Sequence, residues 1–433
     1  MGLELPTSSN SSSLFHVMGI INNFTQKKMI VRNPKIGNVS KACFSLIAIT
    51  LTLFVSCKHD NKQQQPSDLY TIDVELAVNE KKSVPISNVA LDINYIPLET
   101  TPHILIGRVQ QIEITESFIF IGERNCLQQF NREGRFIRQI GSVGRGPENY
   151  QSIMYFAVNE AANKILIQGE HSLNWYDLKG KYIRSHKEQK FTSKLLYFNP
   201  TRLACNRYAD IENPTSLIIW NTNLEPICKF KSHNPPIKKK LKMSSGPLYS
   251  YENNIYFKEN YNDTLYCIKN NSMIPYVVYK ENKLLIDRDF DLHPGPDMQE
   301  IIKKAQNKLI NNSIIESKIF VFSDYIKGLP FGSRDTRYTR VLFNKTEKKV
   351  VALSDPEMIN DIDGGFSFWP TNNCQNNILI RHISAFDLKT HINSNNFKNS
   401  TPKYPEKKKA LEKLANSLDE NDNPVLMLVK LKE

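Results

Sequence analysis

The sequence predicts an all-β fold, a six-bladed β-propeller with a helical insertion and a ring closed by strands near the two ends of the domain. The main observation is a repeat: Phe130–Arg138 returns 46 positions later as Tyr176–Arg184. In both copies an aromatic residue, Asn or Asp, Gly, a basic residue, a second aromatic residue, Ile and Arg stand in register. This pattern is typical of two strands joined by a tight turn, because Gly accepts the positive φ that such a turn needs. Repeats of about 40–50 residues with this content are typical of propeller blades.

Groups of strands at a similar spacing supply the second observation. Trp220-Asn221 corresponds to Tyr176-Asp177 at a spacing of 44. The first blade begins at 109–121 and runs through the first copy of the repeat, and the other strands are expected as follows: 156–158, 164–168, 173–177 and 182–184 in the second blade; 194–198, 202–206, 217–221 and 226–230 in the third; 248 onward, 254–258, 264–268 and 275–279 in the fourth; 318–323, 337–344 and 350–353 in the fifth; 366–369 and 377–380 in the sixth.

The third observation is an apolar strand at the end of the chain, Asn423–Lys430. Apolar and polar residues also alternate at Tyr70–Leu76 and at 93–98, where Pro97 restricts the second strand to a sheet edge or a strand end. A terminal strand beside an early strand closes a propeller ring and leaves no exposed edge. We therefore expect 93–98 to complete the blade formed at the carboxyl end.

Two helices are expected to interrupt the strands. Asp297 follows Pro294-Gly295-Pro296 and can cap a helix with an apolar face made of Met298, Ile301, Ile302, Ala305 and Leu309. A lysine-rich helix is expected at Pro405–Leu418. Covering the core is the expected role of the first helix, and binding a partner is the alternative.

The first 69 residues precede the predicted propeller domain, 70–433, and divide into three parts. Residues 1–28 are rich in Ser and Asn and are interpreted as disordered or as a mis-assigned start. Residues 29–56 place basic residues before an apolar run that is shorter than the roughly 20 residues of a membrane span. The run stops at Ser56-Cys57 and resembles a bacterial lipoprotein signal peptide, in which the cysteine receives the lipid. A cleaved secretory signal with an incidental cysteine is the alternative, and 57–69 is expected to be a flexible tether.

Composition points to no cofactor and no nucleic-acid partner. The net charge is +12, but the basic residues are spread along the chain. The densest later run, Lys238–Lys242, lacks the stacking aromatic residues of a nucleic-acid module and is interpreted as a solvated loop. Apart from Cys43 and Cys57 five cysteines remain, and none forms a Cys-x-x-Cys pair, so no zinc site or disulfide framework is indicated. We expect no metal, no cofactor and a monomer.

Four segments resemble the six-bladed β-propeller lipoproteins of Bacteroides-type bacteria, which are distantly similar to NHL-repeat propellers. They are Leu98-Glu99-Thr100, Gly141–Tyr150, Asn262–Tyr266 and Asn360–Gly365 followed by Phe368-Trp369-Pro370. Asn149 stands where the family often has Glu before Tyr. The resemblance covers about 70–433 and implies the fold and an envelope location, and the family largely lacks an assigned activity.

Two of these segments supply the candidate binding residues at the rim of the ring. Gly141–Tyr150 lacks the Lys-Ser/Thr and the helix of a phosphate loop, so it is interpreted as a crossover between blades, with a rim contact through Arg145, Glu148 or Tyr150 as the alternative. Asp361 and Asp363 are similar to a calcium loop, but position twelve of that loop would be Asn372, so a hydrogen-bonded turn is favoured. Trp369 could stack on a sugar or belong to the core.

No catalytic motif is found: the sequence has neither a Gly-x-Ser-x-Gly elbow nor a His-Glu-x-x-His pair. The leading hypothesis is a non-enzymatic binding module for an envelope protein or a glycan, anchored by lipid at Cys57 in the cell envelope, at the outer membrane and facing the periplasm or the surface. The alternative is a polysaccharide hydrolase or lyase with carboxylates in the central funnel. A purely scaffolding role is the third hypothesis.

Overall fold

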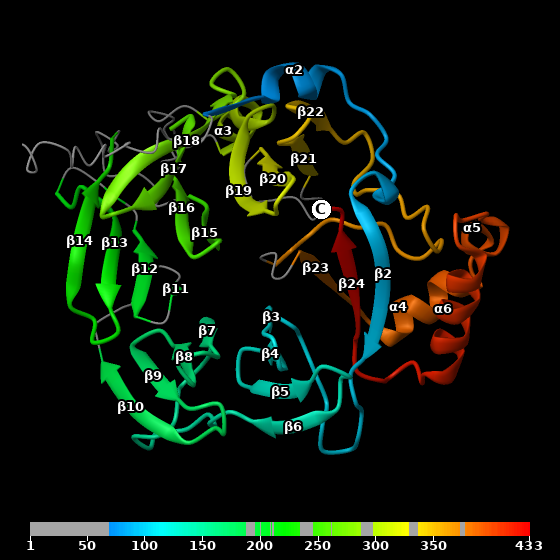
Figure 1. The fold of residues 1–433 in the computed structure, drawn as a ribbon, viewed down its shortest axis with the longest axis horizontal. Coiled ribbons are helices and arrows are strands. Elements are labelled where there is room, and N and C mark those ends of the chain that lie inside the picture. The colour runs from blue at the N-terminus through cyan, green and yellow to red at the C-terminus, as the bar shows by residue number, and fades with distance from the viewer. Residues whose placement is uncertain are drawn as a thin grey trace, which may run out of the picture. The chain divides into compact units, whose positions relative to one another are not determined.

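The structure is a computed structural model that describes residues 69–187, 195–199, 201–207, 209, 212–233, 246–260, 262–286, 298–328, 337–372 and 377–433. These residues belong to one compact unit, Gln64–Glu433. Its strands form six sheets arranged around a common axis, which confirms the predicted six-bladed β-propeller (Figure 1). The predicted signal peptide, Cys57, the tether up to residue 68 and Lys238–Lys242 lie outside the described residues.

The first three blades are antiparallel sheets of four strands each, with the first strand of each blade nearest the axis (Figure 1). The first blade is β3 (Gln111–Ile114), β4 (Phe118–Gly122), β5 (Leu127–Asn131) and β6 (Phe136–Gln139); the second is β7 (Tyr155–Asn159), β8 (Lys164–Gln168), β9 (Ser172–Tyr176) and β10 (Tyr182–Lys187); the third is β11 (Leu195–Asn199), β12 (Arg202–Asn206), β13 (Thr215–Asn221) and β14 (Pro226–Lys231). Apolar side chains fill the space between neighbouring blades. Phe120 and Leu127 of the first blade, for example, share a core cluster with Phe156 and Ile165 of the second.

The fourth and fifth blades depart from the prediction at one strand. The fourth is β15 (Leu248–Tyr251), β16 (Asn254–Lys258), β17 (Thr264–Lys269) and β18 (Ser272–Lys280), and the fifth is β19 (Leu309–Glu316), β20 (Phe320–Lys327), β21 (Arg337–Asn344) and β22 (Lys349–Ala352). The inserted helix α3 is Met298–Ala305, so Leu309 is not on the helix but begins β19. The backbone of Leu309 forms hydrogen bonds with Leu284 and Ile286. The spacing of four residues from Ala305 suits a helix and gives no sign of these bonds.

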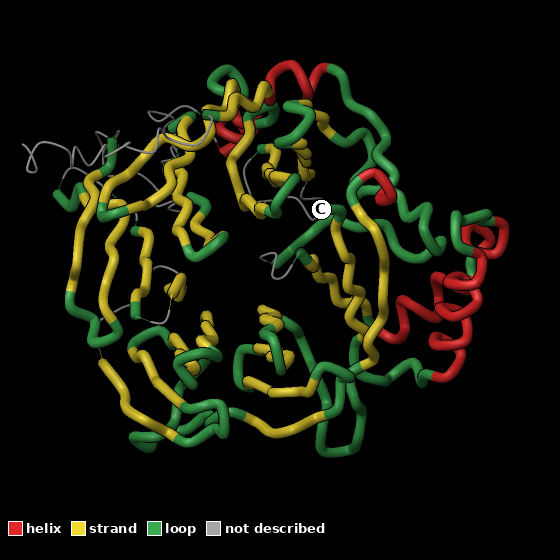
Figure 2. Tube along the Cα trace, in the orientation of Figure 1, coloured by secondary structure: helices red, strands yellow, loops and turns green. Residues whose placement is uncertain are grey.

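Ring closure occurs as predicted. The outermost strand of the sixth blade, β2 (Ala90–Pro97), pairs antiparallel with β24 (Val425–Leu431), which pairs with β23 (Ile378–Ile383). The strand predicted at 366–369 is wrong, because that segment has only an isolated bridge between Met358 and Phe368. Among the described residues the sheet of this blade has three strands, β2, β24 and β23 (Figure 2).

A strap that the sequence did not predict runs along the outer edges of three blades. β1 (Tyr70–Asp73) adds a parallel fifth strand to β18 of the fourth blade. The chain then forms α2 (Val74–Asn79), bridges Lys82 to Leu353 of the fifth blade, and passes through the 3-10 helix η1 (Ile86–Asn88) into β2. The single strand predicted at Tyr70–Leu76 is wrong after Asp73, because the carboxylate of Asp73 accepts a hydrogen bond from Leu76 N (2.9 Å) and caps α2.

Three helices fill the connection from β23 to β24 and cover the sixth blade: α4 (Ala385–Asn393), α5 (Asn395–Asn399) and α6 (Pro405–Ser417). The predicted lysine-rich helix is α6. Its buried face adds Leu411 and Ala415 to the core cluster that contains Val425 and Met427 of β24. No helix in the described part of the chain is long and apolar enough to cross a membrane.

The repeated turn owes its shape to one side-chain oxygen. Asn131 Oδ1 accepts from Glu133 N (3.1 Å) and Arg135 N (2.8 Å), and Asp177 Oδ1 accepts from the backbone N–H groups two and four residues on (2.9 and 2.8 Å). Gly134 and Gly180 supply the positive φ, +83° and +81°. In the third blade Asn221 makes the same pair of bonds, but Leu224 takes the positive φ, at +67°.

The arginine of the repeat joins neighbouring blades. Arg138 donates to the carbonyl of Lys179 in the turn of the second blade (2.9 Å), and Arg184 donates to that of Thr222 in the turn of the third. At the next junction the contact changes, and Arg202 donates to Asn271 Oδ1 in the fourth blade (3.2 Å). The sequence repeat thus encodes a turn together with a contact to the next blade.

Two buried ion pairs lie at the junction of the fourth and fifth blades. Lys258 Nζ lies 2.7 Å from Glu281 Oε1, and Lys345 Nζ lies 2.8 Å from Glu316 Oε1. Both carboxylates are fully buried, and Glu316 also accepts hydrogen bonds from the hydroxyls of Tyr249 and Tyr276 (2.7 and 2.5 Å). Buried charges of this kind are stable only when each is paired and hydrogen-bonded.

Candidate functional site

Two neighbouring cavities with shared lining residues lie where the innermost strands of the blades meet. The inner chamber, about 170 Å³, is lined by the strands nearest the axis, with Gln111, Glu113, Ser250 and Asn372 among its polar residues. The outer chamber, about 950 Å³, shares Glu113 and Ser250 with the inner one. Its lining comes from all six blades and the turns beside them: Glu113, Thr115, Glu116, Val158, Glu160, Ala161, Tyr197, Ser250, Tyr251, Glu252, Asn253, Ser317, Lys318, Asn377 and Glu433.

The first strand of the first blade shapes the wall of these chambers. The amide of Gln111 accepts from Phe156 N (3.1 Å) and donates to Phe156 O (2.7 Å), and Glu113 Oε1 accepts from Val158 N (3.1 Å). Gln111 and Glu113 lie on β3, and the groups they bond belong to the edge of β7 that faces the axis. The side chains of one strand therefore take the place of a neighbouring strand and satisfy a sheet edge.

The outer chamber is acidic although the protein is basic. Its described lining includes five glutamates and one lysine, Lys318. Burial raises the pKa of Glu160, but side-chain hydrogen bonds from Ser117 and Thr115 and bonds from backbone N–H groups outweigh it, so its pKa lies below the ordinary range. Glu160 is therefore ionised at neutral pH and contributes a fixed negative charge to the chamber.

The predicted residues of the crossover Gly141–Tyr150 differ in their exposure. Arg145 and Glu148 are exposed. Tyr150 is fully buried, donates to Ile140 O (3.3 Å) and packs edge-on against Tyr176, whose hydroxyl donates to Glu148 O (2.7 Å). Tyr150 therefore holds the crossover to the second blade, and of these three residues only Arg145 and Glu148 present side chains to solvent.

Asp361 and Asp363 point toward different partners. Asp361 accepts from the backbone N–H and the hydroxyl of Ser87 (3.0 and 2.6 Å) and pairs with Lys403 (3.2 Å). Asp363 Oδ1 accepts from Asn360 Nδ2, Gly365 N and the Tyr95 hydroxyl, at 2.7, 2.8 and 3.3 Å. Among the described residues no group of three or more His, Cys, Asp or Glu side chains could hold a metal ion.

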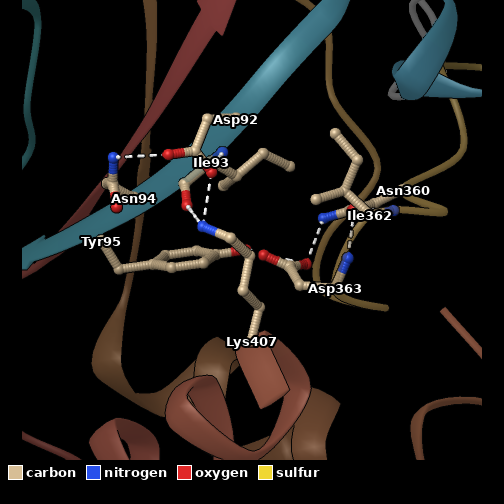
Figure 3. Close-up of polar contacts among 8 residues, drawn as sticks. All are labelled: Asp92, Ile93, Asn94, Tyr95, Asn360, Ile362, Asp363 and Lys407. Carbon is tan, nitrogen blue, oxygen red and sulfur yellow. Dashed lines mark hydrogen bonds and ion pairs between the residues drawn. The ribbon is translucent and has the colours of Figure 1, made fainter. Parts of the chain in front are cut away.

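Asp363 belongs to a group of residues that fastens the closing strand, which we call the closure cluster: Asp92, Tyr95, Asn360, Asp363 and Lys407 (Figure 3). Lys407 of α6 binds the carboxylate of Asp92 and the carbonyl of Ile93 (3.2 Å), both on β2. Burial raises the pKa of Asp363, and burial together with the negative charge of Asp363 raises that of Tyr95 far above its usual range. The cluster joins β2, the loop at 360–365 and α6.

Trp369 is part of the core between the fifth and sixth blades. It is 2% exposed, lies edge-on to Phe322 (5.5 Å between ring centroids) and has the guanidinium of Arg340 5.4 Å from its ring centre. Arg340 is bound to Asp324 and Glu357 (3.3 Å each), and Glu357 also pairs with Arg381. Trp369 therefore has no free face for a sugar.

The predicted rim residues do not converge on one site. Gly141–Tyr150 connects the first blade to the second, whereas Asp361, Asp363 and Trp369 follow the last strand of the fifth. The chamber residues Gln111, Glu113 and Glu252 were not singled out from the sequence. A usable signal was the alternation of polar side chains at Gln111, Glu113 and Thr115 in the first strand of a blade, which faces the axis.

The comparisons with known proteins agree with the fold. A family model described as "Domain of unknown function (DUF4934)" matches residues 69–430. The search of curated proteins finds no match. A crystal structure from Bacteroides fragilis NCTC 9343, described as a "Putative exported protein", is 15% identical with a TM-score of 0.62, covering 84% of this chain and 99% of that one.

Two further structures are more distant. The WD40 domain of Neurospora crassa Pan2 is 12% identical with a TM-score of 0.35, covering 57% of this chain and 65% of that one. An ancestral GH74 enzyme is 12% identical with a TM-score of 0.35, covering 60% of this chain and 32% of that one. At these scores the two likenesses add nothing about function.

Proposed function

The chain belongs to the DUF4934 family, and from that premise we propose that it is a non-enzymatic binding module of the bacterial cell envelope. In this proposal lipid on Cys57 attaches the protein to a membrane, with the outer membrane as the expected site. A protein or glycan partner binds at the outer chamber. The description of the similar Bacteroides fragilis protein as exported supports an envelope location, as does the resemblance of 29–57 to a lipoprotein signal. The relation to NHL-repeat propellers is part of the same proposal.

The observation that carries the binding role is the outer chamber itself. Its volume of about 950 Å³ is at the upper end of ligand pockets, which are commonly about 300–1,000 Å³. Side chains from all six blades line it, so the ring as a whole holds their positions. Five glutamates against one lysine favour a partner that carries positive charge or many hydroxyl groups.

The same carboxylates favour binding over hydrolysis. A glycosidase needs one carboxyl group with a raised pKa as the general acid, opposite a second carboxylate. Glu160 has a lowered pKa. Burial raises the pKa of three acidic residues, Glu123, Asp324 and Asp363, and these three line neither chamber.

The test is a binding screen of the soluble form beginning at Lys58 against a glycan array and envelope proteins, with product formation measured in parallel. We expect retention without product, and weaker retention at high salt because exposed charges are screened. Glu116→Lys should weaken retention. Glu133→Lys is the matched control, since Glu133 lies in an exposed turn outside the chamber. Product formation would overturn the proposal in favour of the hydrolase or lyase, and silence in both assays would favour a scaffold.

A further inference from the structure

A small cavity lies at the junction of the fourth and fifth blades, apart from the two central chambers. Its volume is about 20 Å³, and its wall is made by Lys258 and Asn260, by Leu285 and Ile286 of the crossover between the blades, and by 309–311 of β19. Most of this wall is apolar. The exceptions are the side chains of Lys258, Asn260 and Asn311.

Asn311 has an unsatisfied amide at this cavity. The residue is 3% exposed, and among the described residues neither its Nδ2 nor its Oδ1 has a hydrogen-bond partner. The register of β19 shifts between Asn311 and Ser313, so that Asn311 is buried in the blade and the next residue, Asn312, is exposed. Buried amides in folded proteins are nearly always hydrogen-bonded, and an unbonded one is costly.

We propose that this cavity binds one water molecule, which is a fixed part of the blade junction and bonds to both amide atoms of Asn311. A cavity needs roughly 10–15 Å³ to hold a water, so 20 Å³ suits one molecule. The ligand must donate to Oδ1 and accept from Nδ2, and water does both.

The surrounding charges exclude an ion at the same place. Lys258 is 1% exposed, lines the cavity and is paired with Glu281, so an added cation would be buried without a partner charge. The ammonium group of Lys258 is already neutralised by Glu281 at 2.7 Å, so an added anion would bring an unpaired charge into a buried site. A neutral ligand of the size of water is the remaining choice.

Crystal structures of the wild type and two variants test the proposal. In the wild type we expect one density peak at about 2.7–3.2 Å from both amide atoms of Asn311. Asn311→Ser enlarges the cavity and keeps a hydroxyl, so the peak should persist. Asn311→Leu keeps the branched shape of the side chain and removes both polar atoms, so the peak should be lost.

Three results would overturn the proposal: a dry cavity in the wild type in a map that shows other buried waters, an Asn311 amide bonded directly to a protein group, or a peak that persists in Asn311→Leu. If Asn311→Leu does not fold, the wild type and Asn311→Ser still decide the question. These crystallographic tests do not depend on the binding role proposed for the outer chamber.

Discussion

Replacing one glycine in each copy of the repeat should separate the cost of the turn from the cost of ring closure. Gly134 and Gly180 have nearly the same φ, +83° and +81°. A methyl group at Gly180 would have its nearest neighbours at 3.5 and 3.6 Å, which is ordinary contact. A methyl group at Gly134 would overlap the carbonyl oxygen of Pro97 at the end of β2 and lie 2.9 Å from Ile96 Cγ2.

The expected magnitudes follow from these surroundings. Gly180→Ala should lower the free energy of unfolding only by the strain of an L residue in the left-handed conformation, about 1–2 kcal/mol. Gly134→Ala should add the displacement of the chain after β2. That displacement breaks the bonds from Glu99 N to Gly134 O and from Phe136 N to Glu99 Oε2, both 2.8 Å. At about 0.5–1.5 kcal/mol for each bond, Gly134→Ala should cost about 2–5 kcal/mol in total.

Urea unfolding of both variants measures the difference, as a shift of the midpoint at unchanged slope. Leu224→Gly is a useful third variant, because Leu224 already has positive φ and its replacement exchanges strain for lost packing. Equal costs for Gly134→Ala and Gly180→Ala would refute the conclusion that the first turn supports the closing strand.

Three further variants test other parts of the fold. Lys345→Met should lower the free energy of unfolding by about 3–5 kcal/mol by leaving Glu316 buried without its cation, and the double variant with Glu316→Gln should regain most of this stability. If urea unfolding places Lys345→Met within about 1 kcal/mol of the wild type, the ion pair is contradicted. Arg138→Ala should cost about 0.5–1.5 kcal/mol by removing the bond to Lys179, whereas Arg135→Ala, exposed in the same hairpin, should be near neutral in the same assay. Burial raises the pKa of Asp361, but bonds from Ser87 and Lys403 outweigh it and hold the pKa below 3.8, so the stability that Asp361 contributes is present above that pH and lost below it. The free energy of unfolding of Asp361→Asn should therefore differ most from that of the wild type near pH 6 and least near pH 3. A constant difference across urea melts at these pH values would count against the assignment.

The strands were predicted best where a local sequence pattern is compatible with only one backbone conformation. The Asn or Asp and the Gly of the repeat specify a turn by their own hydrogen bonds and φ, so the strands beside them were found. Leu309 was misplaced because an apolar residue four positions after Ala305 suits a helix as well as a new strand. Asp73 was missed as a helix cap because α2 has only six residues and little periodicity.

The candidate site was harder to predict because exposure depends on packing between distant segments. Tyr150 and Trp369 resemble ligand-binding aromatic residues in sequence, and their burial follows from contacts with Tyr176 and Phe322 in other strands. The chambers are formed by residues from six blades, and no segment alone indicates which glutamates share one cavity.

The pairing of β2 with β24 has a consequence for how the protein is made. Residues 90–97 leave the ribosome more than 300 residues before their partner, 425–431. During synthesis β2 therefore lacks its neighbour while the other blades can already form. An unpaired strand edge is prone to aggregation, so chaperones that hold the chain until residues 425–431 emerge should decide the yield of folded protein. Shortening the chain by its final strand should leave an assembly that cannot close, whatever the quality of the other blades.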